Sequence, residues 1–399
     1  MENTLGEIRK RERTSNGIRE RAGTFSETGK RPGTFNEIRK RAGTFNEVLA
    51  RAEAGHNLTR QELLVLLEAR GEKELQALFR AADRQRHLTM GDAVHLRGII
   101  EFSNYCRQNC FYCGLRAGNG KLRRYRLQPE EIVAVAKEAI ALGYGTLVLQ
   151  SGEDPYYTAD VLCRVIQGIR HLNPEVAITL SVGERSYADY RQFRAAGADR
   201  YLLKHETSDP QLFARLRPGT SLEARLERLA WLRELGYQVG SGNMVGLPGQ
   251  TWESLADDLL LLQELDVEMA GIGPFIPHPD TPLAGTRGGT LEDTLKVLAC
   301  ARLLLPFAHL PATTATGTIH PRGRQLALQA GANVVMPNVT PAEYRPHYTI
   351  YPNKICIAEA ASHCRLCVEG MIASLGRVVA KGPGHSPKPA FSVTNSGKE

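Results

Sequence analysis

From about residue 97 onward, short apolar runs alternate with amphipathic helical patterns, and this alternation limits the folds open to the chain. Helical patterns such as PEEIVAVAKEAIALG and SLEARLERLAWLREL separate the runs. The candidate strands fall at 96–103, 145–150, 176–182, 199–204, 238–245, 268–273, 311–314 and 333–336. Eight strands alternating with helices over roughly 240 residues predict an α/β fold, a (β/α)8 barrel of the TIM type. A doubly wound sheet is the alternative, but no phosphate-binding glycine motif follows the first strand.

The segments outside this barrel differ in composition. Residues 1–50 are a degenerate decapeptide repeat of low complexity, ending in RAGTFSETGK, RPGTFNEIRK and RAGTFNEVLA. Each copy has too few apolar residues to bury, which predicts a mostly disordered arm. Residues 51–96 are expected to form N-terminal helices, and 97–380 the barrel with a C-terminal segment at 340–370. Residues 381–399 are rich in Gly, Pro, Ser and Lys and are expected to be a flexible tail.

The net charge of +7 is concentrated in the N-terminal arm. Residues 1–51 carry 12 Lys and Arg against 7 Asp and Glu, a net charge of +5, which leaves +2 for the rest of the chain. A nucleic-acid interface on the barrel is therefore not expected. The arm itself either binds nucleic acid or an acidic partner, or is a sequence duplication without a role. No apolar run approaches the ~18 residues of a membrane span and no secretory signal is visible, so a cytoplasmic protein is expected.

Three cysteines follow the first predicted strand at close spacing. Cys106, Cys110 and Cys113 lie in SNYCRQNCFYCGLR, a C-x3-C-x2-C pattern on a loop. A structural zinc site needs four ligands, and no fourth Cys or His stands nearby at suitable spacing. A [4Fe–4S] cluster prefers thiolates and fits three of them better. Three ligands for four irons leave one iron open, which indicates catalysis rather than simple electron transport.

This motif, with Tyr112 before its third cysteine, resembles the radical S-adenosylmethionine (SAM) superfamily. The resemblance implies that SAM binds the open iron, and that electron transfer from the reduced cluster releases a 5′-deoxyadenosyl radical. Gly152 and Glu153 resemble the turn that holds the amino group of SAM. The resemblance also assigns SAM contacts to Tyr112, Ser181, Glu206 and Arg225, with the Arg225 guanidinium pairing with the methionyl carboxylate.

Within the superfamily, the chain resembles the branch of biotin synthase, methylornithine synthase and the [FeFe]-hydrogenase maturase family HydE, most strongly HydE. The stretches LVLQSGEDPYY, LLKHET and GNMVGLPGQT carry the resemblance, as does a second triplet, Cys356-x7-Cys364-x2-Cys367. This triplet matches an accessory [2Fe–2S] or [4Fe–4S] cluster site of HydE. Tyr348 and Tyr351 match tyrosines at the substrate end of the cavity.

The HydE resemblance implies assembly of the di-iron subcluster of the hydrogenase. The substrate would be an organometallic small molecule, a cysteine-bound iron carbonyl/cyanide complex, supplied by another hydrogenase maturase. Two alternatives remain open. One is a methylornithine synthase or a similar enzyme of the same branch, and the other is a non-catalytic iron–sulfur carrier.

Overall fold

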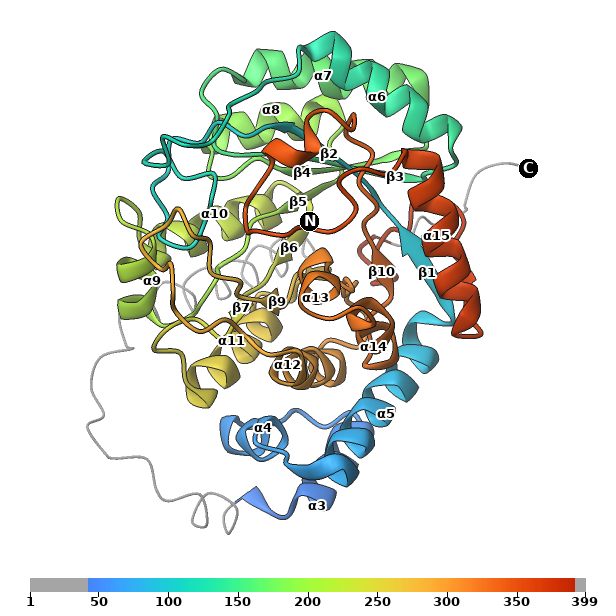
Figure 1. Ribbon diagram of the computed structural model, residues 1–399. Helices are drawn as coiled ribbons and strands as arrows, with labels where there is room; N and C mark the ends of the chain where they lie inside the picture. Colours follow the sequence, from blue (N-terminus) through green and yellow to red (C-terminus); the bar gives the residue numbers. More distant parts are fainter. Residues whose placement is uncertain (1–41, 392–399) are drawn as a thin grey trace, which may run out of the picture.

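A ring of parallel strands surrounded by helices makes up the centre of the computed structural model, which describes residues 42–391 (Figure 1). Six strands pair in sequence order, β2-β3-β4-β5-β6-β8, and every pairing is parallel. Their bounds are β2 (Gly98–Ser103), β3 (Thr146–Ser151), β4 (Ala177–Ser181), β5 (Arg200–Leu202), β6 (Gln238–Ser241) and β8 (Met269–Ala270). β2 and β3 are mainly apolar runs because a parallel sheet covered by helices is buried on both faces.

The ring closes through single-residue bridges. Met269 pairs with His309, and Pro311 pairs with Val334 in β10 (Val334–Val335). Ile99 of β2 then pairs with Asn338, which returns the ring to its first strand. The predicted (β/α)8 barrel is thereby confirmed, and the doubly wound sheet is excluded because such a sheet has two open edges.

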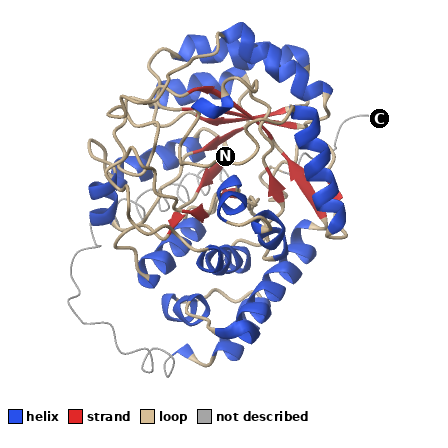
Figure 2. Cartoon of the chain, viewed as in Figure 1, coloured by secondary structure: helices blue, strands red, loops and turns tan. Residues whose placement is uncertain are grey.

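Helices follow the strands and cover the outside of the barrel (Figures 1 and 2). Most of them begin at a Ser, Thr or Asp whose side chain accepts a hydrogen bond from a backbone amide of the first turn. The helices are α6 (Pro129–Ala141), α7 (Ala159–Leu172), α8 (Tyr187–Ala196), α9 (Pro210–Leu216), α10 (Leu222–Glu234), α11 (Trp252–Glu264), α12 (Leu291–Leu304), α13 (Thr314–Ile319) and α14 (Gly323–Gln329).

Shorter elements complete the described residues. The two-residue strands β7 (Met244–Val245) and β9 (Gly273–Pro274) pair with each other beyond β6 and β8. The strand β1 (Ala93–Leu96) pairs with β10 and with β11 (Val378–Val379), outside the ring. A single turn of 3-10 helix, η1 (Arg345–His347), and the helix α15 (Ala361–Ser374) belong to the C-terminal segment. In the part of the chain that the structure describes, no helix is both long and apolar enough to cross a membrane.

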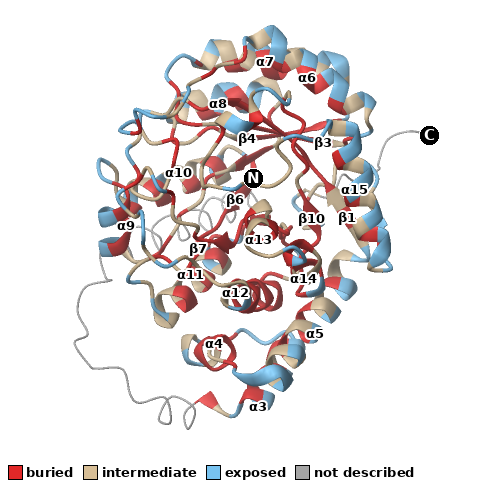
Figure 3. Cartoon of the chain, viewed as in Figure 1, coloured by how far each residue is buried: buried red, intermediate tan, exposed pale blue. Residues whose placement is uncertain are grey.

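Three N-terminal helices, α3 (Phe45–Glu53), α4 (Arg60–Leu67) and α5 (Gly71–Met90), pack against α12, which is buried from Thr294 to Leu304 between them and the barrel (Figure 3). The prediction of a disordered arm up to residue 50 is wrong for residues 42–50. Thr44 and Glu47 form a capping box, and Phe45, Val48 and Leu49 are buried. The last repeat copy ends in the apolar run VLA, and its Val48 and Leu49 are buried where α3 contacts α4 and α5. The rest of the predicted arm, residues 1–41, lies outside the described residues.

The chain after residue 380 packs against the amino-terminal ends of the barrel strands, with contacts from Pro383 to Lys388. The carbonyl oxygen of Pro383 accepts a hydrogen bond of 2.7 Å from Nη2 of Arg200, and Ser386 is buried. The predicted flexible tail at 381–399 is therefore wrong for 381–391, because these residues supply acceptors to a buried guanidinium. Residues 392–399 lie outside the described part.

A chain ending after Ala380 is expected to lose about 1–3 kcal/mol of unfolding free energy, because the guanidinium of Arg200 loses the Pro383 carbonyl that it donates to. Urea unfolding followed by circular dichroism measures this loss. A chain ending after Phe391, which keeps Pro383, is the matched control and should be more stable than the chain ending after Ala380. Equal stability of the two truncated chains would contradict the assignment.

Candidate active site

The first cysteine triplet lies on the loop that follows β2, at the carboxyl end of the barrel. Cys110 is buried, and Cys106 and Cys113 are partly buried. Arg124 fixes this loop, because its guanidinium donates hydrogen bonds to the carbonyl oxygens of four loop residues. These acceptors are Asn104, Leu115, Arg116 and Asn119.

Burial raises the pKa of all three thiols above their ordinary value, and for Cys113 the neighbouring thiols Cys110 and Cys106 add to the rise. Thiols in this setting hold their protons until a metal replaces them. Among the described residues, no three His, Cys, Asp or Glu side chains converge on one point as a single metal ion requires. Three soft sulfur donors on one short loop fit the larger iron–sulfur cluster that the motif predicts.

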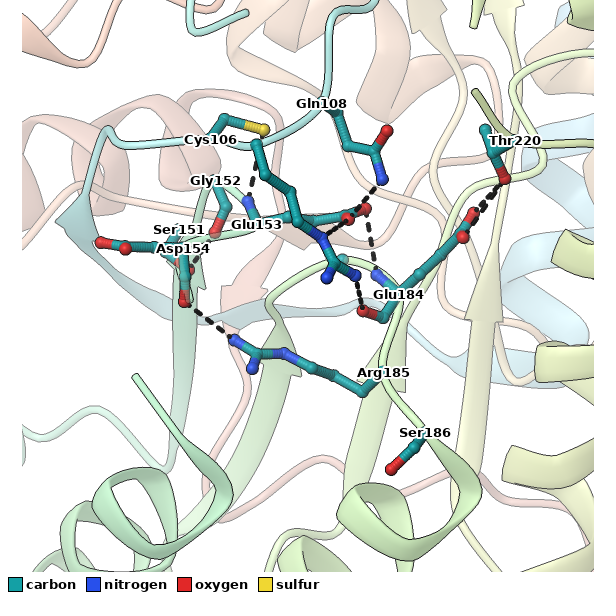
Figure 4. A network of polar contacts seen from close by, with 12 residues as sticks. Cys106, Gln108, Ser151, Gly152, Glu153, Asp154, Glu184, Arg185, Ser186 and Thr220 are labelled. Atoms are coloured by element: carbon teal, nitrogen blue, oxygen red, sulfur yellow. Dashed lines mark hydrogen bonds and ion pairs between the residues drawn. The ribbon is translucent and has the colours of Figure 1, made fainter. Parts of the chain in front are cut away.

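The turn after β3 packs directly against this loop (Figure 4). The backbone N–H of Glu153 points to Sγ of Cys106 at a distance of 3.4 Å. A Cβ at Gly152 would lie 2.1 Å from the carbonyl oxygen of Tyr105 and 2.8 Å from Cβ of Cys106. Only glycine allows this approach of the turn to the cysteine loop.

The carboxylate of Glu153 binds protein donors. It accepts hydrogen bonds of 2.6 Å from Nε2 of Gln108, 3.3 Å from Nε of Arg107 and 3.1 Å from the backbone N–H of Glu184 (Figure 4). Its acceptor sites are thus largely occupied, so the turn offers backbone groups rather than this carboxylate to a ligand.

A cavity of about 350 Å³ opens beside the cysteine loop, enclosed by residues that follow several barrel strands. All residues predicted for the first cluster, for SAM and for substrate line it, so the structure brings these predictions together. They are Cys106, Cys110, Tyr112, Cys113, Gly152, Glu153, Ser181, Glu206, Arg225, Tyr348 and Tyr351. The second cysteine triplet does not line the cavity.

Glu206 lines the cavity, and its backbone conformation is strained. Its φ of 67° lies in the left-handed region that a non-glycine residue rarely adopts. Two backbone hydrogen bonds hold it there: its N–H donates to Gly242 at 2.9 Å, and its carbonyl accepts from Met244 at 3.1 Å. Strain of this kind is common at functional sites.

Comparisons with known proteins place this geometry in a family. The model of the radical SAM superfamily matches residues 100–262. The "[FeFe] hydrogenase maturase subunit HydE" of Thermotoga maritima is 54% identical over 319 residues, which cover 80% of this chain and 91% of that protein. The chain belongs to the HydE family of radical SAM enzymes. As a member, it uses a [4Fe–4S] cluster and SAM.

More distant relatives of this HydE family member agree with the assignment. A 3-methylornithine synthase of Methanosarcina barkeri is 32% identical, covering 70% of this chain and 79% of that protein. A solved structure of methylornithine synthase superposes with a TM-score of 0.74 at 28% identity, covering 84% of this chain and 97% of that one. The hydrogenase maturase HydG from Carboxydothermus hydrogenoformans has a TM-score of 0.71 at 19% identity, covering 93% and 83%, and shares the fold.

In this HydE family member, the C-terminal segment covers the cavity as a strap, defined here as residues 338–357. The carbonyl oxygen of Ile350 accepts from the N–H of Gly114 at 3.0 Å, which joins the strap to the cysteine loop. Lys354 forms an ion pair with Glu101, a buried carboxylate of β2. The strap thereby places Tyr348 and Tyr351 in the cavity, and burial raises the pKa of both phenols.

The second triplet spans the end of this strap, at Cys356, and the helix α15, at Cys364 and Cys367. Cys356 has a φ of 61°, Cys364 is buried in α15, and Cys367 of the same helix is exposed. A hydrogen bond from Cys364 and the guanidinium of Arg324, with Nη1 3.7 Å from Sγ of Cys356, lower the pKa of Cys356. This thiol is therefore predisposed to lose its proton, unlike the three thiols of the first triplet.

Sequence reasoning missed several residues that line the cavity or hold it together. Glu184 pairs with Arg225, with Oε1 and Nη2 2.7 Å apart, and both side chains are buried. Lys204 follows β5 and lines the cavity, where burial lowers its pKa and Glu206 opposes that shift. Arg217 lies beside Tyr112, with Nη1 donating to the hydroxyl at 2.8 Å. Their position at or just after the ends of predicted strands could have identified Glu184 and Lys204, whereas nothing in the local pattern distinguishes Arg217.

Glu184→Gln is expected to raise the KM for SAM on the order of tenfold, because Arg225 loses the charge that orients it. Steady-state formation of 5′-deoxyadenosine against SAM concentration measures the effect. Glu227→Gln, an exposed position on α10, is the matched control and should leave KM unchanged. An unchanged KM in Glu184→Gln would show that Arg225 needs no such orientation.

Proposed function

We propose that this enzyme cleaves SAM with a [4Fe–4S] cluster held by Cys106, Cys110 and Cys113. The observation that carries the proposal is the position of three buried or partly buried thiols at the edge of a cavity at the carboxyl end of the barrel. In barrels of this type, the loops at the carboxyl ends of the strands carry the active site. When bound, the reduced cluster supplies the electron that splits SAM into methionine and a 5′-deoxyadenosyl radical.

SAM would bind along the wall formed by β3 to β6. The turn of Gly152 and Glu153 would hold its amino group through backbone carbonyls, since the Glu153 carboxylate already accepts three hydrogen bonds. The guanidinium of Arg225 would bind the methionyl carboxylate, and its buried Nε has no hydrogen-bond acceptor among residues 42–391. Ser181 and Glu206 line the same wall and would contact the rest of the molecule.

The remaining cavity would hold the substrate and exclude water from it. Tyr348 and Tyr351 contribute phenol groups that stay protonated at neutral pH, because burial raises the pKa of each. A protonated phenol can donate a hydrogen bond to an anionic or carbonyl-bearing substrate. The strap closes this end of the cavity through the Lys354–Glu101 ion pair.

We infer that the reaction belongs to [FeFe]-hydrogenase maturation, as the name of the Thermotoga maritima relative states for that protein. The substrate would be a cysteine-bound iron carbonyl/cyanide complex, which a partner maturase supplies. The enzyme would then act in assembly of the di-iron subcluster.

Cys356, Cys364 and Cys367 would hold an auxiliary [2Fe–2S] or [4Fe–4S] cluster. The low pKa of Cys356 beside Arg324 supports metal binding, since metals bind the thiolate. Because this triplet lies outside the cavity, the auxiliary cluster would not contact SAM.

Two assays test the proposal. The chain is reconstituted anaerobically with iron and sulfide and then reduced in the presence of SAM, and 5′-deoxyadenosine should form. A cluster whose spectrum does not change when SAM is added would favour an iron–sulfur carrier. In a cell-free hydrogenase maturation mixture, omission of this enzyme should abolish hydrogenase activity. Full activity without it would overturn the pathway assignment, and turnover of lysine would favour a methylornithine synthase.

A further inference from the structure

Arg217 is a buried cation at the end of α9, and neither the motif nor the family resemblance assigns it a role. Its side chain is 7% exposed and lines the same cavity as the cysteines. Nη1 donates to the hydroxyl of Tyr112 at 2.8 Å, whereas Nε is buried and has no acceptor in the described structure. A guanidinium in this setting requires a compensating negative charge.

The nearby carboxylates do not supply that charge at close range. Nη2 of Arg217 lies 3.9 Å from Oε1 of Glu153, and this carboxylate already binds Arg107 and Gln108. The carboxylate of Glu184 pairs with Arg225 instead. The charge of Arg217 therefore acts on the groups around Tyr112, which are the cysteine loop and the carboxylate of Glu206.

Two contacts fix Arg217 relative to this loop. The N–H of Phe111 donates to the carbonyl oxygen of Leu216 at 2.9 Å, so the end of α9 is hydrogen-bonded to the residue that follows Cys110. Leu216 also packs in a small apolar cluster that Tyr112 covers.

We propose that Arg217 is a positioning residue that stabilises the negative charge of the cluster at Cys110 and thereby raises its reduction potential. This rests on the proposed function of the first triplet. Reduction adds an electron to a centre already bound by three thiolates, so a cation beside Cys110 favours the reduced state over the oxidised one. Removing the cation makes reduction harder.

Redox titration followed by electron paramagnetic resonance tests this on the anaerobically reconstituted full chain, without SAM. Arg217→Gln should move the midpoint potential to a more negative value with unchanged iron content. Arg217→Lys keeps the charge and should stay near the wild-type potential. Arg215→Gln removes the same charge from an exposed position of α9 and should also match the wild type.

Each outcome decides the proposal. An unchanged potential in Arg217→Gln, or an equal shift in Arg215→Gln, overturns it. If Arg217→Gln fails to retain iron, the result for Arg217→Lys tests the proposal. This variant keeps the positive charge, so loss of its cluster, or a midpoint potential well below that of the wild type, also overturns the proposal. A wild-type chain that holds no cluster at all would instead refute the proposed function.

Discussion

Cys110→Ala is expected to abolish 5′-deoxyadenosine formation. Cys110 is the most buried of the three cysteines in the first triplet, and its loss leaves two sulfurs for the cluster. Two ligands on a short loop cannot hold a cuboidal cluster against exchange with solvent, so iron content should fall with activity. Iron and sulfide analysis of anaerobically reconstituted protein, together with a single-turnover SAM cleavage assay, measures both.

Cys300→Ala is the matched control. Cys300 is fully buried within α12 and lies outside the cavity, so its thiol serves as a small apolar group. Iron content and SAM cleavage should stay at the wild-type level. If Cys110→Ala retained both, the first triplet would not be the catalytic cluster site.

Gly152→Ala is the second change with a large expected effect. The new Cβ would meet the carbonyl oxygen of Tyr105 at 2.1 Å, so the turn or the cysteine loop must move. Overpacking of this kind typically destabilises a protein by about 1–3 kcal/mol. Because the displaced atoms include Cβ of Cys106, we expect the variant to lose cluster occupancy as well. Thermal unfolding and the iron-to-protein ratio report the two effects separately.

Gly120→Ala tests whether any added methyl near this loop has the same result. A Cβ at Gly120 would meet no atom within 4 Å. This variant should keep wild-type stability and iron content. An equal loss in both variants would mean that the loop is sensitive to glycine replacement in general, and not to the contact at Gly152.

Local patterns in the sequence were enough to identify the barrel and the cysteine loop. Each strand and helix is predicted from the spacing of its apolar residues within about 15 positions, and Cys106, Cys110 and Cys113 lie within one loop. Gly152, Glu153 and Glu206 follow strands and Ser181 is the last residue of one, and parallel strands of a barrel end at the same face. Their convergence on one cavity thus follows from the fold class.

The ends of the chain were harder to predict from composition. The copy RAGTFNEVLA becomes part of α3 because Phe45 and Val48 find a surface on neighbouring helices, which its repeat pattern does not reveal. Residues 381–391 look like a tail, yet they satisfy the buried Arg200. In both places, a distant part of the chain supplies the partner.

Alternation and cysteine spacing in the sequence therefore determined the barrel, the cluster loop and the set of strand ends that form the cavity. Only the tertiary structure decided that Glu184 orients Arg225, that Arg124 fixes the cysteine loop and that Arg217 reaches Tyr112. The physical reason is that Glu184 with Arg225 and Arg217 with Tyr112 are far apart along the chain, and that the acceptors of Arg124 are backbone carbonyls that any residue carries. The energies of these contacts depend on distance and burial in space, which no local pattern of residues records.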